Sequence, residues 1–212
     1  MSTSLASELL RWYWIHGKEY SFRRTTDPYH ILVSEILLRQ TQAIQVDSVF
    51  DRLVEEYPTV SHLASADPVR LTKLLQPLGI IRRAEQLVTV ARIIVSEHSG
   101  KIPSEMDDLV SLPGVGDYIA GCTLSLSFGD PTPAVDINIE RVISRLFGLP
   151  QRGGGRPDAR VLDAYVRLLR RAGDRSLHYA MIDFAHEVCR QRIPRCEECP
   201  LRTQCTYAQS QV

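Results

Sequence analysis

The chain has 212 residues, of which 44% are apolar, and it carries 25 basic and 25 acidic side chains. This length suits one large domain or two smaller ones around real hydrophobic cores, and the composition excludes a disordered chain. A formal net charge of zero does not by itself indicate a polyanionic partner. An argument for nucleic-acid binding must therefore rest on local features.

No apolar run approaches the roughly 20 residues that a membrane-spanning helix needs. The first residues, MSTSLASELLRWYW, also lack the basic-then-apolar order of a secretion signal. We therefore expect a soluble, cytoplasmic protein without a membrane partner. Among the basic residues only Lys18, Lys73 and Lys101 are lysines. Arginine suits bidentate contact with phosphate, although a GC-rich genome would give the same bias.

Apolar residues recur at helical spacing along most of the chain, and strand-like alternation is nearly absent. The clearest helical segments are residues 5–13, 31–37, 71–78, 88–95 and 139–147. Pairs or clusters of proline and glycine separate them, and the longest cluster, LPQRGGGRPD at residues 149–158, is the best candidate for a flexible loop. The pattern predicts an all-α fold with about ten helices.

Glu35 lies within the second of these segments, four residues after Ile31 and three before Leu38, so it shares a helix face with apolar residues. A carboxyl group buried there would have a raised proton affinity, as a general acid requires. The alternative, that Glu35 lies at the solvent-exposed edge of the helix, is equally compatible with the pattern.

A glycine-rich turn, Leu112-Pro113-Gly114-Val115-Gly116, separates two helical segments. Two glycines allow a tight turn and leave the free N–H groups of the next helix open to a phosphate oxygen. An ordinary helix connection would have the same residues. Further along, Asp136 precedes a helical run and is most simply its N-cap.

Four of the five cysteines, Cys189, Cys196, Cys199 and Cys205, form a C-x6-C-x2-C-x5-C pattern within seventeen residues. Thiols so close together in an intracellular protein indicate a metal site rather than a disulfide framework. Zinc and a [4Fe-4S] cluster would both be satisfied by four thiolates, and the spacing alone leaves the two open. Cys122 lies in an apolar helix and is predicted to belong to the core.

Three arginines, Arg190, Arg192 and Arg195, lie between the first two cysteines of this pattern. Such a basic finger could contact a phosphate backbone. Solvated charge beside a metal site is nearly as plausible from the residues alone.

Taken together, SEILLRQTQ, LPGVGDYIAG, PAVDIN and the cysteine pattern closely resemble the helix-hairpin-helix (HhH-GPD) DNA glycosylases of the endonuclease III and MutY superfamily, from about Leu9 to Tyr207. The resemblance implies two helical lobes with a DNA and base cleft between them. The first is a six-helix barrel, residues 23–133, with the helix-hairpin-helix motif at about 105–122. The second combines residues 1–22 with 134–212 and holds a [4Fe-4S] cluster in loop 189–205.

The resemblance also implies roles for single residues. Asp136 would stabilise the oxocarbenium-like sugar cation, Glu35 would protonate the departing base, and Asn138 would support this site. Tyr118 occupies the position where bifunctional relatives place a lysine nucleophile, and a phenol cannot form a Schiff base. The resemblance therefore implies a monofunctional glycosylase with weak or no lyase activity.

Other residues are assigned to DNA binding by the same resemblance. Backbone amides of the turn, which comprises Leu112, Gly114, Val115 and Gly116, would hold a phosphate. Gln40 would fill the space left by the flipped nucleotide, and Ile80 or Ile81 would be the wedge. The four cysteines would hold the cluster.

The segments DPYHILVSEILLR, RRAEQL and MIDFAHEVC resemble the short archaeal mismatch glycosylases that remove thymine or uracil opposite guanine. The alternative is a MutY-like adenine glycosylase acting opposite guanine or 8-oxoguanine, which Gln40-Thr41-Gln42 and Asn138 favour. Because the sequence ends seven residues after Cys205, we expect no MutT-like domain that reads 8-oxoguanine.

A second alternative is a non-catalytic DNA-binding iron-sulfur module, against which the presence of both Glu35 and Asp136 argues. The partners implied are double-stranded DNA with a mismatched base and a downstream AP endonuclease. We expect a monomer in the nucleoid-associated cytoplasm of a prokaryote.

Overall fold

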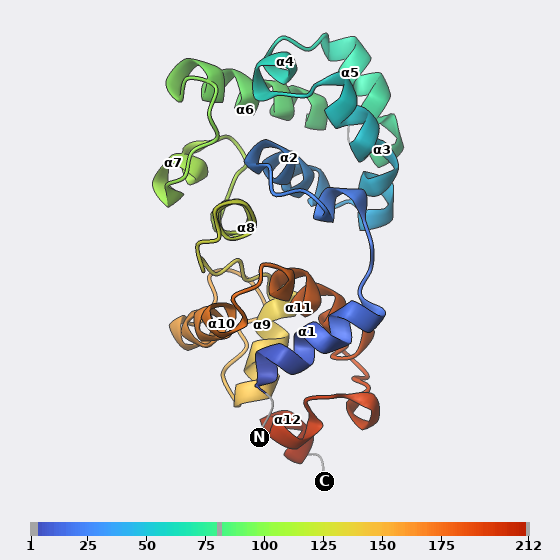
Figure 1. The fold of residues 1–212 in the computed structure, drawn as a ribbon, viewed down its shortest axis with the longest axis vertical. Coiled ribbons are helices and arrows are strands. Elements are labelled where there is room, and N and C mark those ends of the chain that lie inside the picture. The colour runs from blue at the N-terminus through green and yellow to red at the C-terminus, as the bar shows by residue number, and fades with distance from the viewer. Residues whose placement is uncertain (1–3, 80–81, 211–212) are drawn as a thin grey trace. The chain divides into compact units, whose positions relative to one another are not determined.

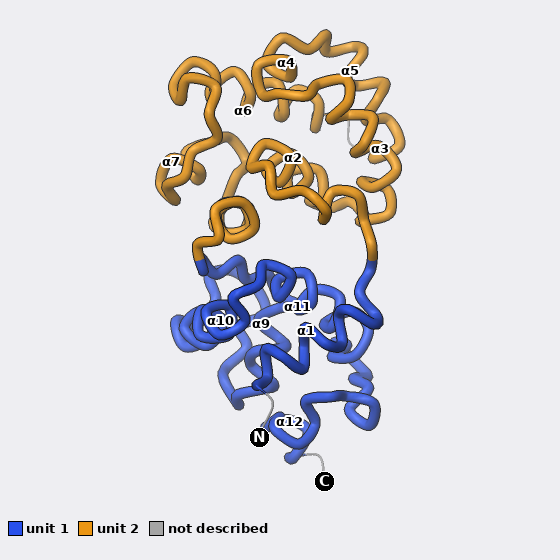
Figure 2. Tube along the Cα trace, in the orientation of Figure 1, with its two compact units in different colours: residues 1–18, 131–212 blue, residues 19–130 orange. Residues whose placement is uncertain are grey.

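The computed structural model describes residues 4–79 and 82–210, which form helices and connecting loops without a β-strand (Figure 1). The all-α prediction is confirmed, with twelve α-helices in the described chain. Two compact units are present: unit 1 combines Met1–Lys18 with Pro131–Val212, and unit 2 is Glu19–Asp130 (Figure 2). No helix of the described chain is long and apolar enough to cross a membrane.

Unit 2 contains seven α-helices and three shorter helical turns. They are η1 (Ser21–Arg23), α2 (Pro28–Leu38), α3 (Ala43–Glu56), α4 (Val60–Ala64), α5 (Pro68–Leu75), η2 (Gln76–Leu78), α6 (Arg82–Glu97), α7 (Met106–Ser111), α8 (Asp117–Thr123) and the π-helical η3 (Leu124–Phe128). Two Asp-Pro pairs, Asp27-Pro28 and Asp67-Pro68, start α2 and α5. Asp27 accepts from the N–H of Tyr29 and Asp67 from that of Arg70, with proline at the first helical position.

Helix α2 lies at the centre of unit 2 and is buried on nearly every side. It packs against α3, α6, α8, η1 and η3. The helix is apolar almost all round, as expected for a helix enclosed by its neighbours. The polar side chains of Ser34 and Glu35 on α2 are therefore held inside the unit.

Unit 1 is built from both ends of the chain. Its elements are α1 (Leu5–His16), α9 (Ile137–Phe147), α10 (Ala159–Ala172), α11 (Ser176–Glu187), η4 (Cys196–Glu198), η5 (Arg202–Gln204) and α12 (Thr206–Gln209). Helix α1 packs on α10 and α11, and α9 packs on α10, α11 and α12. The core between them contains Leu9, Ile143, Tyr165 and Phe184.

The hydroxyl of Tyr29 provides a test of the unit 2 core. It donates to the carbonyl of Tyr57 at 2.7 Å, and burial raises the pKa of Tyr29, so the group remains a neutral donor. We expect Tyr29→Phe to lower the free energy of unfolding by about 1–2 kcal/mol, because the Tyr57 carbonyl would stay buried without its donor.

Urea unfolding of the full chain measures this effect. The control is Tyr20→Phe, since the Tyr20 hydroxyl makes no hydrogen bond within the described chain and its ring stacks on Phe22. Equal stability of Tyr29→Phe and the wild type would contradict the importance of this contact.

Candidate functional site

The glycine-rich turn joins α7 to α8, and its carbonyl groups are held by two side chains from other helices. Arg39 Nη1 donates to the carbonyl of Gly114 at 2.8 Å, and Gln86 Nε2 donates to that of Pro113 at 3.1 Å. Gly114 has a left-handed backbone, with φ of 76°. These contacts occupy the acceptors of the turn and hold its backbone in one conformation.

The amide groups of the turn are not equivalent. The N–H of Val115 donates to the carbonyl of Leu112 at 3.0 Å and is engaged inside the turn. The side chains of Leu112 and Val115 are buried in the unit 2 core. No hydrogen bond within the described chain occupies the N–H groups of Gly114 and Gly116, so these two are the amides available to an anion.

Tyr118 lies beside this turn, one residue into α8. Together with Arg39, Gly114, Gly116 and Ile119 it lines a shallow hollow in the surface of unit 2, to which Val115 also contributes. Tyr118 is thus next to the predicted phosphate-binding turn.

The end of α2 is held by a buried arginine that sequence reasoning missed. The guanidinium group of Arg83, on α6, donates to the carbonyls of Ile36 and Arg39. Burial lowers the pKa of Arg83, as does, to a smaller extent, the nearby charge of Arg39. The only hint in the sequence was a charged residue on the apolar side of a helix.

Gln40 follows directly and has a φ of 56°, a left-handed conformation that is unfavourable for a residue with a side chain. Such strain persists only where the surroundings hold it, and it is common at functional sites. The predicted wedge residues Ile80 and Ile81 lie outside the described residues.

Glu35 is 5% exposed, on α2, in the interior of unit 2. The alternative that it marks a wet helix edge is therefore wrong. The carboxyl group of Glu35 is therefore enclosed by the helices that pack around α2.

Asp136 belongs to unit 1 and is the N-cap of α9. Its Oδ1 accepts from the backbone N–H groups of Asn138 at 3.0 Å and Ile139 at 2.7 Å, and its Oδ2 accepts from Asn138 Nδ2 at 2.8 Å. A carboxylate has about four acceptor positions, so roughly one remains for water or substrate. The N-cap interpretation is confirmed, and it leaves the carboxylate rigidly oriented.

Asn138 connects Asp136 to a second buried arginine that sequence reasoning did not find. Asn138 Oδ1 accepts from Arg141 Nη1 at 3.1 Å, and the same guanidinium group donates to the carbonyls of Ala185 and Cys189, each at 3.0 Å. Burial lowers the pKa of Arg141. One guanidinium group therefore joins the support of Asp136 to the first residue of the cysteine pattern.

The four cysteines line a single, mainly apolar pocket in unit 1. Val142, Leu146 and Phe184 also contribute to its walls. Burial raises the pKa of Cys189, and it raises that of Cys199 to about 11. Thiols in such a pocket ionise only when positive charge is brought to them, which metal ions provide.

Arg145, also on α9, holds the loop that follows Cys189. Its Nη1 donates to the carbonyl of Arg190 at 2.6 Å and contacts Cys189 Sγ at 3.6 Å, and its guanidinium group lies 4.7 Å from the ring centre of Tyr207. In the part of the chain that is described, no three His, Cys, Asp or Glu side chains are grouped closely enough for a single metal ion.

The basic finger is less positive than its sequence suggests. Arg190 lies 3.9 Å from Glu187 and Arg195 lies 3.7 Å from Glu198. Arg192 is exposed and has no ion pair within the described chain. Beside it, Ile193 is 80% exposed at the tip of the finger.

The candidate residues thus form two groups. Unit 2 contributes the turn, Tyr118, Gln40 and Glu35, whereas unit 1 contributes Asp136 with its supporting side chains and the cysteine pocket. Carboxyl groups are the commonest general acids and bases besides histidine, and free backbone amides bind anions.

The model of the HhH-GPD superfamily of base excision DNA repair proteins matches residues 33–171. The chain belongs to this superfamily.

Similar proteins span nearly the whole chain. A thymine-DNA glycosylase of Aeropyrum pernix is 37% identical over 210 residues, which cover 96% of this chain and 94% of that protein. The solved structure of a thermostable thymine-DNA glycosylase has a TM-score of 0.88 at 29% identity, covering 97% of this chain and 95% of that one. An adenine DNA glycosylase of Mycobacterium tuberculosis is 32% identical over 92% of this chain, but only 65% of that protein is covered.

The contacts of the turn predict unequal effects for its two glycines. We expect Gly114→Ala to lower stability by at least about 1–2 kcal/mol, because alanine disfavours a left-handed backbone and its methyl group would collide with the side chains of Gln86 and Arg39. Gly116→Ala is the matched control, since φ there is −105° and an added methyl group meets no atom within 4 Å.

Thermal and urea unfolding of both variants test this. Equal stability of the two variants would show that the side chains of Arg39 and Gln86 do not hold the turn in the way described.

Proposed function

We propose that this protein is a DNA glycosylase that flips thymine or uracil mispaired with guanine out of the duplex and hydrolyses its N-glycosidic bond. The observation that carries the proposal is the 37% identity, over almost the full length of both chains, to a thymine-DNA glycosylase. Further relatives are named thymine/uracil-DNA glycosylases. Uracil lacks only the methyl group of thymine, so a pocket that accepts thymine has room for uracil.

In the proposed reaction the bond between the sugar C1′ and the base breaks, and the base leaves with the electron pair. The sugar gains oxocarbenium character until a water molecule adds to C1′ and loses a proton. The carboxylate of Asp136, held by three hydrogen bonds, supplies fixed negative charge beside this developing cation. Because its orientation is set before substrate binds, little reorganisation is needed during the reaction.

We assign to Glu35 the delivery of a proton to the departing base. The support for this assignment is the position of Glu35, a carboxyl group enclosed on α2, because general acids are commonly carboxyl groups. A neutral leaving base departs more easily than an anionic one.

Tyr118 supports hydrolysis without strand cleavage. A lysine at this position would attack the sugar and form a Schiff base, which a phenol cannot do. None of Lys18, Lys73 and Lys101 lies in the glycine-rich turn or in the PAVDIN segment. The product would be an abasic site, which a downstream AP endonuclease would have to process.

For base extrusion we assign the gap-filling role to Gln40 and the phosphate contact to the amides of Gly114 and Gly116. The left-handed backbone of Gln40, held through Arg83, supports a side chain presented in one fixed direction. Filling the vacated space offsets part of the unstacking cost, a few kcal/mol, which is smaller at a mispair. Arg190, Arg192 and Arg195 would also contact the DNA backbone.

We also propose that Cys189, Cys196, Cys199 and Cys205 hold a [4Fe-4S] cluster. The four thiols share one apolar pocket, and Arg145 lies against Cys189 to balance the negative charge of a thiolate cluster. When bound, the cluster would cross-link the C-terminal loop. Arg141 and Arg145 would then orient that loop through its carbonyl groups.

The substrate proposal is tested with single-turnover excision assays on duplexes that contain T·G, U·G, A·G or A·8-oxoG, followed by hot alkali to reveal abasic sites. We expect excision of thymine and uracil opposite guanine. Excision of adenine alone would support the MutY-like alternative, and four intact duplexes would support the binding-module alternative.

Asp136→Asn tests the catalytic assignment in the same assay. Asparagine caps a helix about as well as aspartate, so the variant should fold normally. We expect excision to fall by at least about 100-fold while mismatch binding persists, because charge is removed with little change of shape. The control is Asp67→Asn, at the N-cap of α5. Normal turnover by Asp136→Asn would exclude the proposed role.

The cluster proposal predicts that protein purified without air is brown and contains about four iron and four sulfide ions per chain. Cys199→Ser should lose this iron, whereas Cys122→Ser should keep it, because Cys122 is buried in unit 2, away from the pocket that the other cysteines line. A colourless protein that contains zinc would contradict the assignment.

A further inference from the structure

The segment Gln151–Pro157, the basic glycine loop, joins α9 to α10. It contains Arg152, Arg156 and three successive glycines, and residues 151–156 are all exposed. Gly153, Gly154 and Gly155 have φ values of 74°, 151° and 77°, which only glycine adopts readily. From its composition the loop was expected to be flexible, but its contacts show that one end is firmly held.

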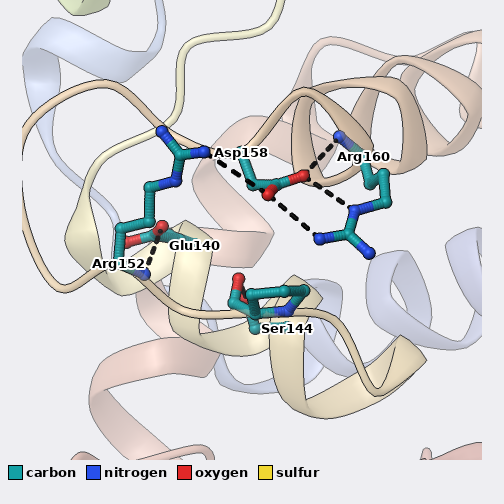
Figure 3. A network of polar contacts seen from close by, with 6 residues as sticks. Glu140, Ser144, Arg152, Asp158 and Arg160 are labelled. Carbon is teal, nitrogen blue, oxygen red and sulfur yellow. Dashed lines mark hydrogen bonds and ion pairs between the residues drawn. The ribbon is translucent and has the colours of Figure 1, made fainter.

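The anchor of the loop is Glu140 on α9, which is 3% exposed (Figure 3). Its Oε1 accepts from the N–H of Arg152 at 3.0 Å and its Oε2 from that of Gly153 at 3.3 Å. Ser144 Oγ donates to the carbonyl of Pro150 at 3.1 Å. Burying a carboxylate is costly, and here both of its oxygens bind the backbone of this loop.

These contacts also give the loop its direction. The N–H of Leu149 bonds to the carbonyl of Ser144 at 2.9 Å, and the following residues reach back to Glu140, one turn earlier on α9. The chain therefore doubles back along α9 as far as Glu140, where Gly153 is held. Asp136 lies about 6 Å from Glu140 along the helix axis, at 1.5 Å per residue. The first glycine of the loop is thus held about one helical turn from Asp136.

The loop is positively charged at its surface. Residues 151–160 contain three arginines and one aspartate, which gives a net charge of +2. Asp158 caps α10 and pairs with Arg160 at 3.0 Å, while Arg152 lies 3.6 Å from it (Figure 3). Arg156 makes no hydrogen bond or ion pair within the described chain. Arg156 is therefore available to a ligand, and Arg152 shares its carboxylate partner with Arg160.

We propose that the basic glycine loop binds a DNA phosphate close to the nucleotide that faces Asp136. Arg152 and Arg156 supply the charge, and the backbone N–H groups of Gly154 and Gly155, which lack a side chain, approach the phosphate closely. The inference rests on the proposed function because it takes Asp136 to face the nucleotide that is hydrolysed. Glu140 acts as a positioning residue, since it places the loop beside that end of α9.

The test compares Arg152→Gln/Arg156→Gln with Arg170→Gln/Arg171→Gln, which removes the same charge at the exposed far end of α10. Both pairs are made in the Asp136→Asn background, so that no duplex is cleaved during the measurement. Fluorescence anisotropy then gives the affinity for a T·G duplex and for a fully paired duplex at several salt concentrations.

We expect the loop variant to reduce the slope of log affinity against log salt by about 1 per arginine, equally on both duplexes, because phosphate contacts do not depend on sequence. The control variant should leave the slope unchanged. An unchanged slope for the loop variant overturns the proposal, and so does an equal reduction in both variants, which would reflect net charge alone.

Excision by the wild-type protein distinguishes failure of the loop proposal from failure of the proposed glycosylase function. If the wild type excises thymine opposite guanine but the loop variant keeps the wild-type slope, only the loop proposal fails. If the slope falls as expected but no duplex is excised, the loop still binds DNA phosphate and the proposed substrate is wrong.

Discussion

Hydrogen bonds from arginine side chains to main-chain carbonyl groups hold the loops of the candidate site in place. Arg83 binds the end of α2, Arg141 binds the end of α11, Arg145 binds the loop after Cys189, and Arg39 binds the glycine-rich turn. A guanidinium group has five donors in a rigid fork, so one side chain spans two carbonyls, which an ammonium group does less well. At a helix end the carbonyl dipoles also offset the cost of burying the charge.

This arrangement gives the arginine-rich composition a structural reason in addition to any contact with phosphate. Arg83 and Arg141 are both buried. Arg83 holds the carbonyl of Arg39, next to Gln40, and Arg141 donates to the Asn138 side chain that supports Asp136. Replacing such an arginine would leave several carbonyls without donors, so the loss would be larger than that of one surface ion pair.

Asp136 combines a structural and a proposed chemical function in one carboxylate. As the N-cap of α9 it uses three of its acceptor positions for Asn138 and Ile139, and the same bonds orient the charge that the reaction needs. The helix that it starts also carries Glu140, Arg141 and Arg145, which hold the basic glycine loop and the cysteine loop. Helix α9 is thus the element of unit 1 on which its proposed functional parts depend.

The sequence by itself determined the helices, their caps and the positions of the motifs. Asp27, Asp67 and Asp136 cap helices through amides within three residues, so the relevant contacts are local and visible in the residue order. The sequence motifs also indicated the family, because four segments resembled those of the family in the same order and at the same spacing.

Only the tertiary structure decided how these parts are supported. Burial of Glu35 required the helices around α2, whereas its own segment allowed two interpretations. The contacts of Arg141 join residues 44 and 48 positions apart, and those of Glu140 turn a loop of flexible composition into an anchored one. Such contacts depend on the packing of distant segments, and no local pattern of residue types specifies that packing.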